Sequence, residues 1–318
     1  MGKSIVTIYY EDDWGKEGDP ISSDPTRRSF EDMHERGITK GVEMYRASIK
    51  WYDTDLGIFS KAWAYREGKW IKVTEPVKPD LVFDKVGGIR DYELFDLKMK
   101  ISTQTKIFNH PMFRTLLDNK LAQYLTLGDF MPKTLLATDK DQFEGALEKI
   151  STEKVVLKPP YGSGGFGILI TEKRNAAEEC SVYPVLVQEF IQNESGIPGF
   201  SNEGEVADLR MVFFNHQFRY ALSRIAKSGS LFTNFHQGAT AVMVPEDRIP
   251  ENAKRAAMDI VGRLSIFKEA QYSLDFMFTK EGEPLLIEMN TTPGVDLLKE
   301  FGDEQLWEQN FNDLASLA

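Results

Sequence analysis

The sequence predicts a mixed α/β and α+β protein built in three parts, and three observations lead to this fold class. Strand and helix patterns alternate as far as about residue 111. Residues 112–190 contain helical patterns and short strands around a glycine-rich loop. Residues 191–318 are richest in strand pairs with tight turns. We therefore expect an N-terminal α/β domain at 1–111, a small α+β lobe at 112–190 and a C-terminal antiparallel lobe at 191–318.

Composition and charge limit the class of protein. The 318 residues are 42% hydrophobic and 27% charged, which is ordinary for a globular chain with a sizeable core. The net charge of -11 repels phosphate backbones, so we expect no nucleic-acid partner. The single cysteine, Cys180, excludes an internal disulfide and fits a reducing compartment. No apolar run approaches the roughly 20 residues that cross a bilayer, so we expect a cytoplasmic protein without a membrane partner.

The first part combines strands rich in β-branched and aromatic residues with one helix. The sequence AWAYREGKWIKV predicts a hairpin that turns at Glu67-Gly68. The other elements expected here are strands at SIVTIYY, VEMYRAS, PDLVFDKVGG and KIFNHP, and a helix from about Thr26 to Arg36 that ends at Gly37.

The second part begins with MFRTLLDNKLAQYLTLG, whose apolar spacing and final glycine predict one helix from Met112. Asp139 is a suitable N-cap for a helix that runs to Ile150. The remaining elements expected here are a strand from Met131-Pro132-Lys133-Thr134, strands at KVVLKPP, GILI and PVLVQEFI, and a short helix near Lys173 to Cys180.

The third part contains two strand pairs and a helix. VADLRMVFF and FRYALSRIA are joined at Asn215-His216, which favours a tight turn. A helix is expected from about Asn252 to Phe267. YSLDFMF and PLLIEMN then predict a second hairpin around residues 280–283.

The stretch VVLKPPYGSGGFGILI contains the pattern G-x-G-x-x-G at Gly162, Gly164 and Gly167. A dinucleotide-binding loop requires a helix after the glycines, whereas this one is followed by a strand. No Gly-Lys-Ser/Thr follows, and no His-Arg-Asp or Asp-Phe-Gly lies downstream, which excludes a Walker A loop and a protein kinase. The remaining interpretation is a mobile glycine flap beside Lys158, with backbone N–H groups and an ammonium directed at phosphate.

Polar residues interrupt several apolar strands. Asp208 and Arg210 share one face of a strand, and Arg224 lies on the next strand, so two arginines are expected to face one anion. Asp275, Glu288 and Asn290 interrupt two strongly apolar strands of one hairpin. Burying unpaired carboxylates is costly, and oxygen ligands suit Mg²⁺ or Mn²⁺, so these three residues predict a divalent metal site.

Other polar segments leave two interpretations open. Asn234 and His236 precede Gly238, and the turn TTPG spans residues 291–294. Either segment is suited to contact a substrate, and either is equally suited to be a plain turn. A structural histidine is the simpler interpretation of His236 alone.

In this order the motifs resemble the ATP-grasp superfamily, in particular ligases such as bacterial glutathione synthetase and the RimK-type ligases. The resemblance extends from about Lys85 to the TTPG turn. It rests on PDLVFDKVGG, DNKLAQYL, MPKT, LKPPYGSGGFGI, LVQEFI, DLR, RIAKSGSLFTNFHQGA, LDFMF and IEMNTTPG. It implies a three-part ATP-grasp fold, in which an N-terminal α/β domain precedes two α+β lobes that clasp ATP.

Matching positions imply a role for each candidate site residue. The nucleotide contacts implied are Lys120, Lys158, Gly162, Ser163, Gly164, Gly165, Gln188, Glu189, Phe190, Asp208 and Asn234. The implied catalytic clamp on the transferred phosphoryl group and the acyl phosphate is Arg210 and Arg224. The implied metal ligands are Asp275, Glu288 and Asn290, and candidate substrate contacts are Lys85, His236, Thr292 and Gly294.

Two positions depart from the pattern of these ligases. Phe232 replaces an arginine that the glutamate ligases tend to have, and Lys85 replaces an arginine that often faces the substrate. The tryptophan-rich hairpin region with Trp51, Trp63 and Trp70 matches no ligase pattern. These departures leave the ATP chemistry intact and leave the identity of the substrate open.

The resemblance implies an ATP-dependent carboxylate–amine ligase that forms an amide, peptide or peptide-like, through an acyl phosphate and releases ADP. ATP and Mg²⁺ or Mn²⁺ are the cofactors implied. The expected partners are a small-molecule carboxylate and an amine, which include an amino acid or a peptide, and a second copy of the chain in a homo-oligomer. The alternatives are an ATP-grasp small-molecule kinase, a non-catalytic nucleotide-dependent binding module, and an enzyme that modifies a protein or peptide tail.

Overall fold

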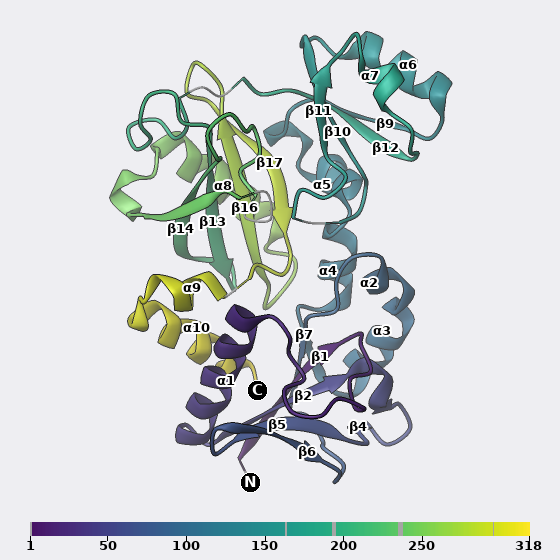
Figure 1. Cartoon of the computed structure of the whole chain (residues 1–318), viewed down its shortest axis with the longest axis vertical. Coiled ribbons are helices and arrows are strands. Elements are labelled where there is room, and N and C mark those ends of the chain that lie inside the picture. The colour runs from purple at the N-terminus through teal and green to yellow at the C-terminus, as the bar shows by residue number, and fades with distance from the viewer. Residues whose placement is uncertain (1, 163, 193–194, 235–237, 295) are drawn as a thin grey trace. The chain divides into compact units, whose positions relative to one another are not determined.

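The computed structural model describes residues 2–162, 164–192, 195–234, 238–294 and 296–318 (Figure 1). The chain forms two compact units. The first contains Met1–Met112 and Thr292–Ala318, and the second contains Phe113–Thr291. The contacts thus group residues 292–318 with the N-terminal part, whereas the sequence analysis assigned them to the C-terminal lobe.

The first unit is built on a six-stranded mixed sheet with the order β6-β5-β2-β1-β7-β8. The strands β2, β1, β7 and β8 are parallel to one another, and the hairpin β5–β6 is added antiparallel to β2. The predicted hairpin turn is confirmed, because Glu67 and Gly68 both have positive φ. The strand bounds are β1 (Lys3–Tyr9), β2 (Val42–Ser48), β5 (Ala62–Arg66), β6 (Lys69–Val73), β7 (Leu81–Asp84) and β8 (Lys106–Phe108), with a separate short pair β3 (Tyr52–Asp53) and β4 (Ile58–Phe59).

Helix α1 (Asp24–Thr39) packs against β2 and β5. The prediction that it ends at Gly37 is wrong, because Gly37 is buried inside the helix. A Cβ at this position would lie 2.5 Å from the carbonyl oxygen of Val42, so the glycine permits close approach to β2. The other helices of this unit are α2 (Ile89–Glu93), α3 (Phe95–Gln104), α9 (Asp296–Phe301) and α10 (Glu304–Leu317), with a 3₁₀ turn at Ile49–Trp51.

The C-terminal helices of the first unit are attached to α1 by charge and hydrogen bonding. Trp307 Nε1 donates to Asp32 Oδ2 at 2.5 Å, and the same carboxylate pairs with Lys299. Arg36 pairs with Asp32 and with Glu308. Trp307 is 1% exposed, so this contact is part of the core of the unit.

The second unit contains two separate sheets, each with its own hydrophobic core. The four-stranded antiparallel sheet has the order β11-β10-β12-β9 and is covered by α6 and α7 (Figure 1). The five-stranded antiparallel sheet has the order β15-β14-β13-β16-β17, and α8 packs into its core. The bounds are β9 (Thr134–Ala137), α6 (Lys140–Lys149), β10 (Lys154–Lys158), β11 (Leu169–Glu172), α7 (Ala176–Glu179), β12 (Val185–Glu189), β13 (Ala207–Phe214), β14 (Gln217–Ile225), β15 (Thr240–Val244), α8 (Glu251–Leu264), β16 (Gln271–Phe278) and β17 (Pro284–Asn290).

The single helix predicted from Met112 is two helices, α4 (Pro111–Leu117) and α5 (Lys120–Leu127). The side chain of Asn119 accepts hydrogen bonds from the N–H groups of Leu121 and Ala122, which caps a new helix. The prediction was therefore wrong at this break, which places Lys120 in the first turn of α5. A 3₁₀ turn at Gly128–Phe130 follows this helix and another, at Glu246–Arg248, precedes α8. Within the described ranges, no helix has both the length and the apolar character needed to span a bilayer.

Histidine 34 makes the stability of the first unit depend on pH. Its ring is 2% exposed, and its Nδ1 accepts a hydrogen bond from the Tyr65 N–H at 3.1 Å. Burial, with a smaller contribution from Arg66, lowers the pKa of His34 from 6.5 to about 3. The native state therefore holds a neutral ring at a pH where the unfolded chain is already protonated.

We expect the neutral His34 ring to contribute fully to the free energy of unfolding above pH 6.5, and this contribution to be lost as the pH falls toward 3. Between about pH 6.5 and about pH 5, wild type should lose roughly 2 kcal/mol more unfolding free energy than His34→Gln, at about 1.4 kcal/mol per pH unit. Urea unfolding of both proteins at several pH values measures this difference. The other titrating groups are the same in both proteins, so their contributions cancel when the two are compared. Parallel pH curves for the two proteins would contradict a neutral buried His34.

Candidate active site

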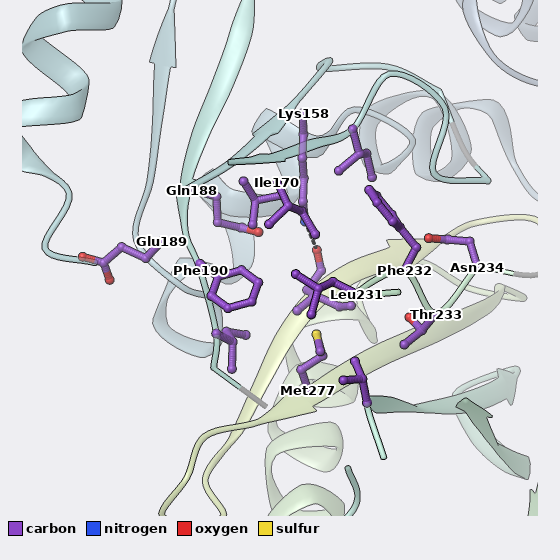
Figure 2. A pocket seen from close by; sticks show the side chains of 15 residues that line it. Lys158, Ile170, Gln188, Glu189, Phe190, Leu231, Phe232, Thr233, Asn234 and Met277 are labelled. Atoms are coloured by element: carbon purple, nitrogen blue, oxygen red, sulfur yellow. Dashed lines mark hydrogen bonds between the residues drawn. The ribbon is translucent and has the colours of Figure 1, made fainter. Parts of the chain in front are cut away.

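A cavity that is open to solvent lies between the two sheets of the second unit. Its wall is mainly apolar, and Figure 2 shows Lys158 at one side and Met277 at the other. The lining residues are Val156, Lys158, Ile168, Ile170, Gln188, Glu189, Phe190, Ile191, Val206, Leu231, Phe232, Thr233, Asn234, Met277 and Ile287.

The end of β12 and the residue after it form one edge of the cavity, which is lined by Gln188, Glu189 and Phe190, the residues expected from the sequence to contact the nucleotide. The Glu189 side chain points away from the cavity (Figure 2), and its carboxylate accepts hydrogen bonds from Ser151 N–H at 3.1 Å and Ser151 Oγ at 2.7 Å. Gln188 donates to Thr134 Oγ1 at 2.9 Å. Because the side chains of Gln188 and Glu189 are hydrogen-bonded to other parts of the protein, the groups of this segment that face the cavity are its backbone and the Phe190 ring.

Two lysines reach this region from different elements. Lys158, at the end of β10, donates to the carbonyl oxygen of Ile287 at 3.1 Å. Ile287 has no partner in the β16–β17 register, because the pairing shifts between Asp275 and Phe276. Burial lowers the pKa of Lys158 to about 8, although Glu288 acts in the opposite direction. Lys120 donates to the carbonyl oxygen of Gly162 and lies 3.2 Å from Glu288.

The loop between β10 and β11 has the conformation that its glycines permit. Gly162, Gly164, Gly165 and Gly167 all have φ between 72° and 102°, a region that other residues rarely adopt. At Gly165, a Cβ would lie 2.9 Å from Asn234 Oδ1. The glycine flap is thus in contact with the loop that follows β14. Ser163, also predicted as a nucleotide contact, lies outside the described residues.

Four charged side chains form an ion-pair ladder on one face of the five-stranded sheet: Asp208 and Arg210 on β13, Arg224 on β14 and Asp275 on β16. Arg210 donates to both carboxylate oxygens of Asp275, at 2.8 and 2.7 Å. Arg224 donates to Asp275 Oδ2 at 2.7 Å and to Asp208 Oδ1 at 2.8 Å. Arg224 is 3% exposed, and the Arg210 side chain is 13% exposed, so Arg210 is the end of the ladder that solvent reaches.

The charge state of the ladder follows from these contacts. Burial alone would raise the pKa of Asp275, but Arg210 and Arg224 outweigh it and hold that pKa below its usual range. Asp275 is therefore ionised near neutral pH. The two arginines and the two carboxylates satisfy one another before any ligand is present.

The predicted metal ligands fit a divalent ion in part. The β16–β17 register pairs Asp275 with Glu288 and Ser273 with Asn290, and paired side chains share one face. The carboxylate of Asp275 is 0% exposed and occupied by the arginines. Among the described residues no group of three His, Cys, Asp or Glu side chains converges. Mg²⁺ needs only one or two carboxylates when phosphates and waters supply the rest, so Glu288 and Asn290 remain the suitable donors.

Three of the four predicted substrate contacts lie in one unit. Lys85, Thr292 and Gly294 belong to the first unit. Lys85 Nζ lies over the ring of Phe83 at 5.1 Å. His236 lies outside the described residues.

Sequence reasoning did not identify several residues that line the cavity. Leu231, Met277 and Ile287 are apolar residues on elements whose polar members drew attention instead. Thr233 has no sequence signal beyond its place directly before Asn234. Phe232 stands out in the sequence only as a departure from an arginine. The pair of apolar residues in the loop sequence GSLFTN is the signal that points to this part of the lining.

The chain is similar to a known protein family and to several curated proteins. The protein-family model described as a RimK-like ATP-grasp domain matches residues 120–305. The chain is 26% identical over 293 residues to a probable alpha-L-glutamate ligase of Parasynechococcus marenigrum, which covers 87% of this chain and 57% of that protein. The chain spans little more than half the length of the first curated relatives that it matches.

Among solved structures, the VanG D-Ala:D-Ser ligase from Enterococcus faecalis is similar over 100% of this chain and 99% of that chain, with a TM-score of 0.68 and 14% identity. The ATP-grasp ligase PsnB complexed with minimal precursor matches 99% of this chain and 100% of that chain, with a TM-score of 0.62 and 14% identity. At this level of identity the likeness concerns the fold.

The buried position of Arg224 leads to a prediction about stability. Replacing Arg224 with Met removes the cation shared by two buried carboxylates, so we expect a loss of about 3–5 kcal/mol in unfolding free energy. Lys254→Met, which breaks an exposed pair with Glu251, is the control and should cost less than about 1 kcal/mol. Urea unfolding measures both. A loss for Arg224→Met as small as that of the control would show that the ladder is not a buried, charge-balanced unit.

Proposed function

Because this chain belongs to the RimK-like ATP-grasp family, whose family model spans residues 120–305, we propose that it is an ATP-dependent carboxylate–amine ligase. The observation that carries the proposal is the arrangement of the second unit. One apolar cavity there adjoins two lysines, a glycine flap and the sheet face that holds the ion-pair ladder and Glu288. These are the groups that bind and align a nucleoside triphosphate.

In this proposal the adenine ring occupies the apolar cavity. The Phe190 ring, Met277 and Ile287 provide apolar contact, and the backbone at the end of β12 provides hydrogen bonds. The phosphates lie toward Lys158 and Lys120, whose ammonium groups exchange protein carbonyl oxygens for phosphate oxygens. The glycine flap covers them and excludes water.

Glu288 and Asn290 are the residues that would hold Mg²⁺, with Asp275 able to join only where a guanidinium contact releases one of its oxygens. The ion supplies charge neutralisation on the phosphates when bound. Arg210, at the exposed end of the ladder, directs its guanidinium toward the phosphoryl group that is transferred. Arg224 is buried, so its contribution is to hold Asp275 and, through it, Arg210 in place.

The reaction proceeds in two displacements. A carboxylate oxygen of the first substrate attacks the γ-phosphorus, the bond to the bridging oxygen breaks, and ADP leaves with an acyl phosphate formed. The amine of the second substrate then attacks the acyl carbon and expels phosphate, with loss of a proton, to give the amide. Both steps require alignment and charge neutralisation more than covalent participation of the protein.

The substrates we propose are an amino acid or a peptide as carboxylate and an amino acid or peptide as amine. Support comes from the relatives, which are probable alpha-L-glutamate ligases, and from solved structures that include a D-Ala:D-Ser ligase and a ligase with a precursor. Lys85, Thr292 and Gly294 remain the candidate substrate contacts in this proposal.

The decisive test is an ADP-release screen of amino acids and short peptides, singly and in pairs, followed by mass spectrometry of the products. Ligation predicts ADP release that requires both a carboxylate and an amine, and a product mass equal to the two substrates less water. ADP release with one substrate and a stable phosphorylated product would instead identify a kinase. No ADP release with any pair would favour a binding module.

Glu288→Gln should reduce ADP release by about 100-fold or more, in line with other losses of electrostatic stabilisation in the transition state. Glu281→Gln, in the exposed turn between β16 and β17, is the matched control and should keep normal turnover. Steady-state rates at saturating ATP measure the comparison. Normal turnover by Glu288→Gln would exclude this carboxylate from the reaction centre.

Nucleotide affinity should fall as the pH rises above about 8, because Lys158 then loses its proton in the free protein. The dissociation constant for an ATP analogue should increase by up to about 10-fold per pH unit. Lys158→Arg stays charged throughout and should show a much weaker dependence, whatever its absolute affinity. Calorimetric titrations between about pH 7 and about pH 9.5 test this. Identical pH dependence in both proteins would place Lys158 away from the phosphates.

A further inference from the structure

A short loop after β14 connects the ion-pair ladder to the glycine flap. This cavity loop, Leu231–Asn234, has all four of its residues in the cavity lining. The hydroxyl of Thr233 donates to Asp208 Oδ2 at 2.6 Å. Thr233 is 5% exposed and Asp208 is 0% exposed, so this is a buried hydrogen bond to a carboxylate.

The next residue of the cavity loop contacts the flap. Asn234 Oδ1 lies where a Cβ of Gly165 would approach to 2.9 Å. Thr233 is therefore hydrogen-bonded to the ladder, and Asn234 lies close to Gly165 of the flap. Two adjacent residues of the cavity loop thus lie against two different parts of the same unit.

A series of hydrogen bonds runs along the ladder from Asp208 to Arg210 at its exposed end. Asp208 accepts from Arg224, Arg224 donates to Asp275, and Asp275 accepts from Arg210. Each buried carboxylate is held by several donors, and hydrogen bonds to charged groups are among the strong ones in proteins. A neutral hydroxyl at the start of this series fixes the cavity loop without changing the charge balance of the ladder.

We propose that Thr233 is a positioning residue that anchors the cavity loop to the ion-pair ladder and thereby couples closure of the glycine flap to nucleotide binding. The inference rests on the proposed nucleotide site but not on the ligation reaction. It assigns Thr233 no contact with reacting atoms. Its effect passes through Asn234 to the flap and through Asp208 to the ladder.

The test compares Thr233→Val, which replaces the hydroxyl with a methyl group of similar size, with Thr233→Ser, which keeps the hydroxyl. Thr233→Val should weaken binding of a non-hydrolysable ATP analogue with Mg²⁺ by about 10- to 100-fold, the range that corresponds to one hydrogen bond to a charged group. Thr233→Ser should stay within about 3-fold of wild type. Calorimetry on folded protein gives the affinities.

A second measurement separates coupling from a merely structural role. Tyr161 and Phe166, in the flap, are 38% and 64% exposed and are sites for limited chymotrypsin cleavage. The ATP analogue at a saturating concentration should protect these sites from cleavage in wild type and in Thr233→Ser. In Thr233→Val the protection should remain incomplete even at saturation, because the flap has lost its anchored neighbour.

Ser223→Ala is the matched control. Ser223 is 0% exposed, stands beside Arg224 on β14 but on the other face of the sheet, and its Oγ has no hydrogen-bond partner in the part of the chain that the structure describes. It should leave affinity and protection unchanged. Thr233→Ala provides a second variant without the hydroxyl if Thr233→Val does not fold.

The outcomes distinguish this inference from the proposed function. Wild-type affinity and full protection in Thr233→Val would overturn the inference and leave the ligase proposal standing. Weakened binding in Thr233→Val with rescue by Ser would support the inference even if no pair of substrates is ligated. Absence of analogue binding by wild type would overturn both.

Discussion

The buried pairing of Asp275 with Arg210 and Arg224 is the interaction on which the second unit depends. A carboxylate that is 0% exposed is tolerated only where cations neutralise it, because an unpaired buried charge costs several kcal/mol. This requirement constrains the register of β13, β14 and β16, since a shift by one residue would move these side chains to the other face. The register of β16 with β17 then places Glu288 beside Asp275. One electrostatic constraint therefore orients the whole face that the proposed chemistry uses.

The lysines follow a different principle from the arginines. Both arginines of the ladder are held by carboxylates on neighbouring strands, whereas Lys158 is held by a single carbonyl oxygen at a shift in the strand pairing. In the proposed nucleotide site, a phosphate oxygen is a stronger acceptor than that carbonyl, so exchanging one for the other would favour the ligand. The ladder would then provide a fixed frame, and the lysines would be the groups that change partners. In this acidic chain of net charge -11, Arg210 and Arg224 are thus both paired with carboxylates.

Sequence patterns predicted the elements whose causes are local. Turns at Glu67-Gly68 and Asn215-His216 are confirmed because these residues adopt positive φ, and Asp139 caps α6 as expected. The ATP-grasp fold class is confirmed by full-length likeness to solved ligase structures. The break at Asn119 and the interior position of Gly37 were missed. A polar cap inside an apolar pattern, and a glycine required by a neighbouring strand, depend on contacts that spacing does not reveal.

The candidate site also contains features that the sequence predicts and features that depend on tertiary contacts. Charged residues on apolar strands can be recognised in a sequence, because a buried charge requires a partner. Arg210, Arg224, Asp275 and Glu288 were all singled out in this way. The sequence does not show which of them pair with one another: Asp275 and Arg224 form a buried pair, while Arg210 and Glu288 keep some exposure. A charge on a strand predicts that a partner exists, but only the register shows which partner it is. The roles of such residues in a site therefore follow from which charges remain accessible after the buried ones have satisfied each other.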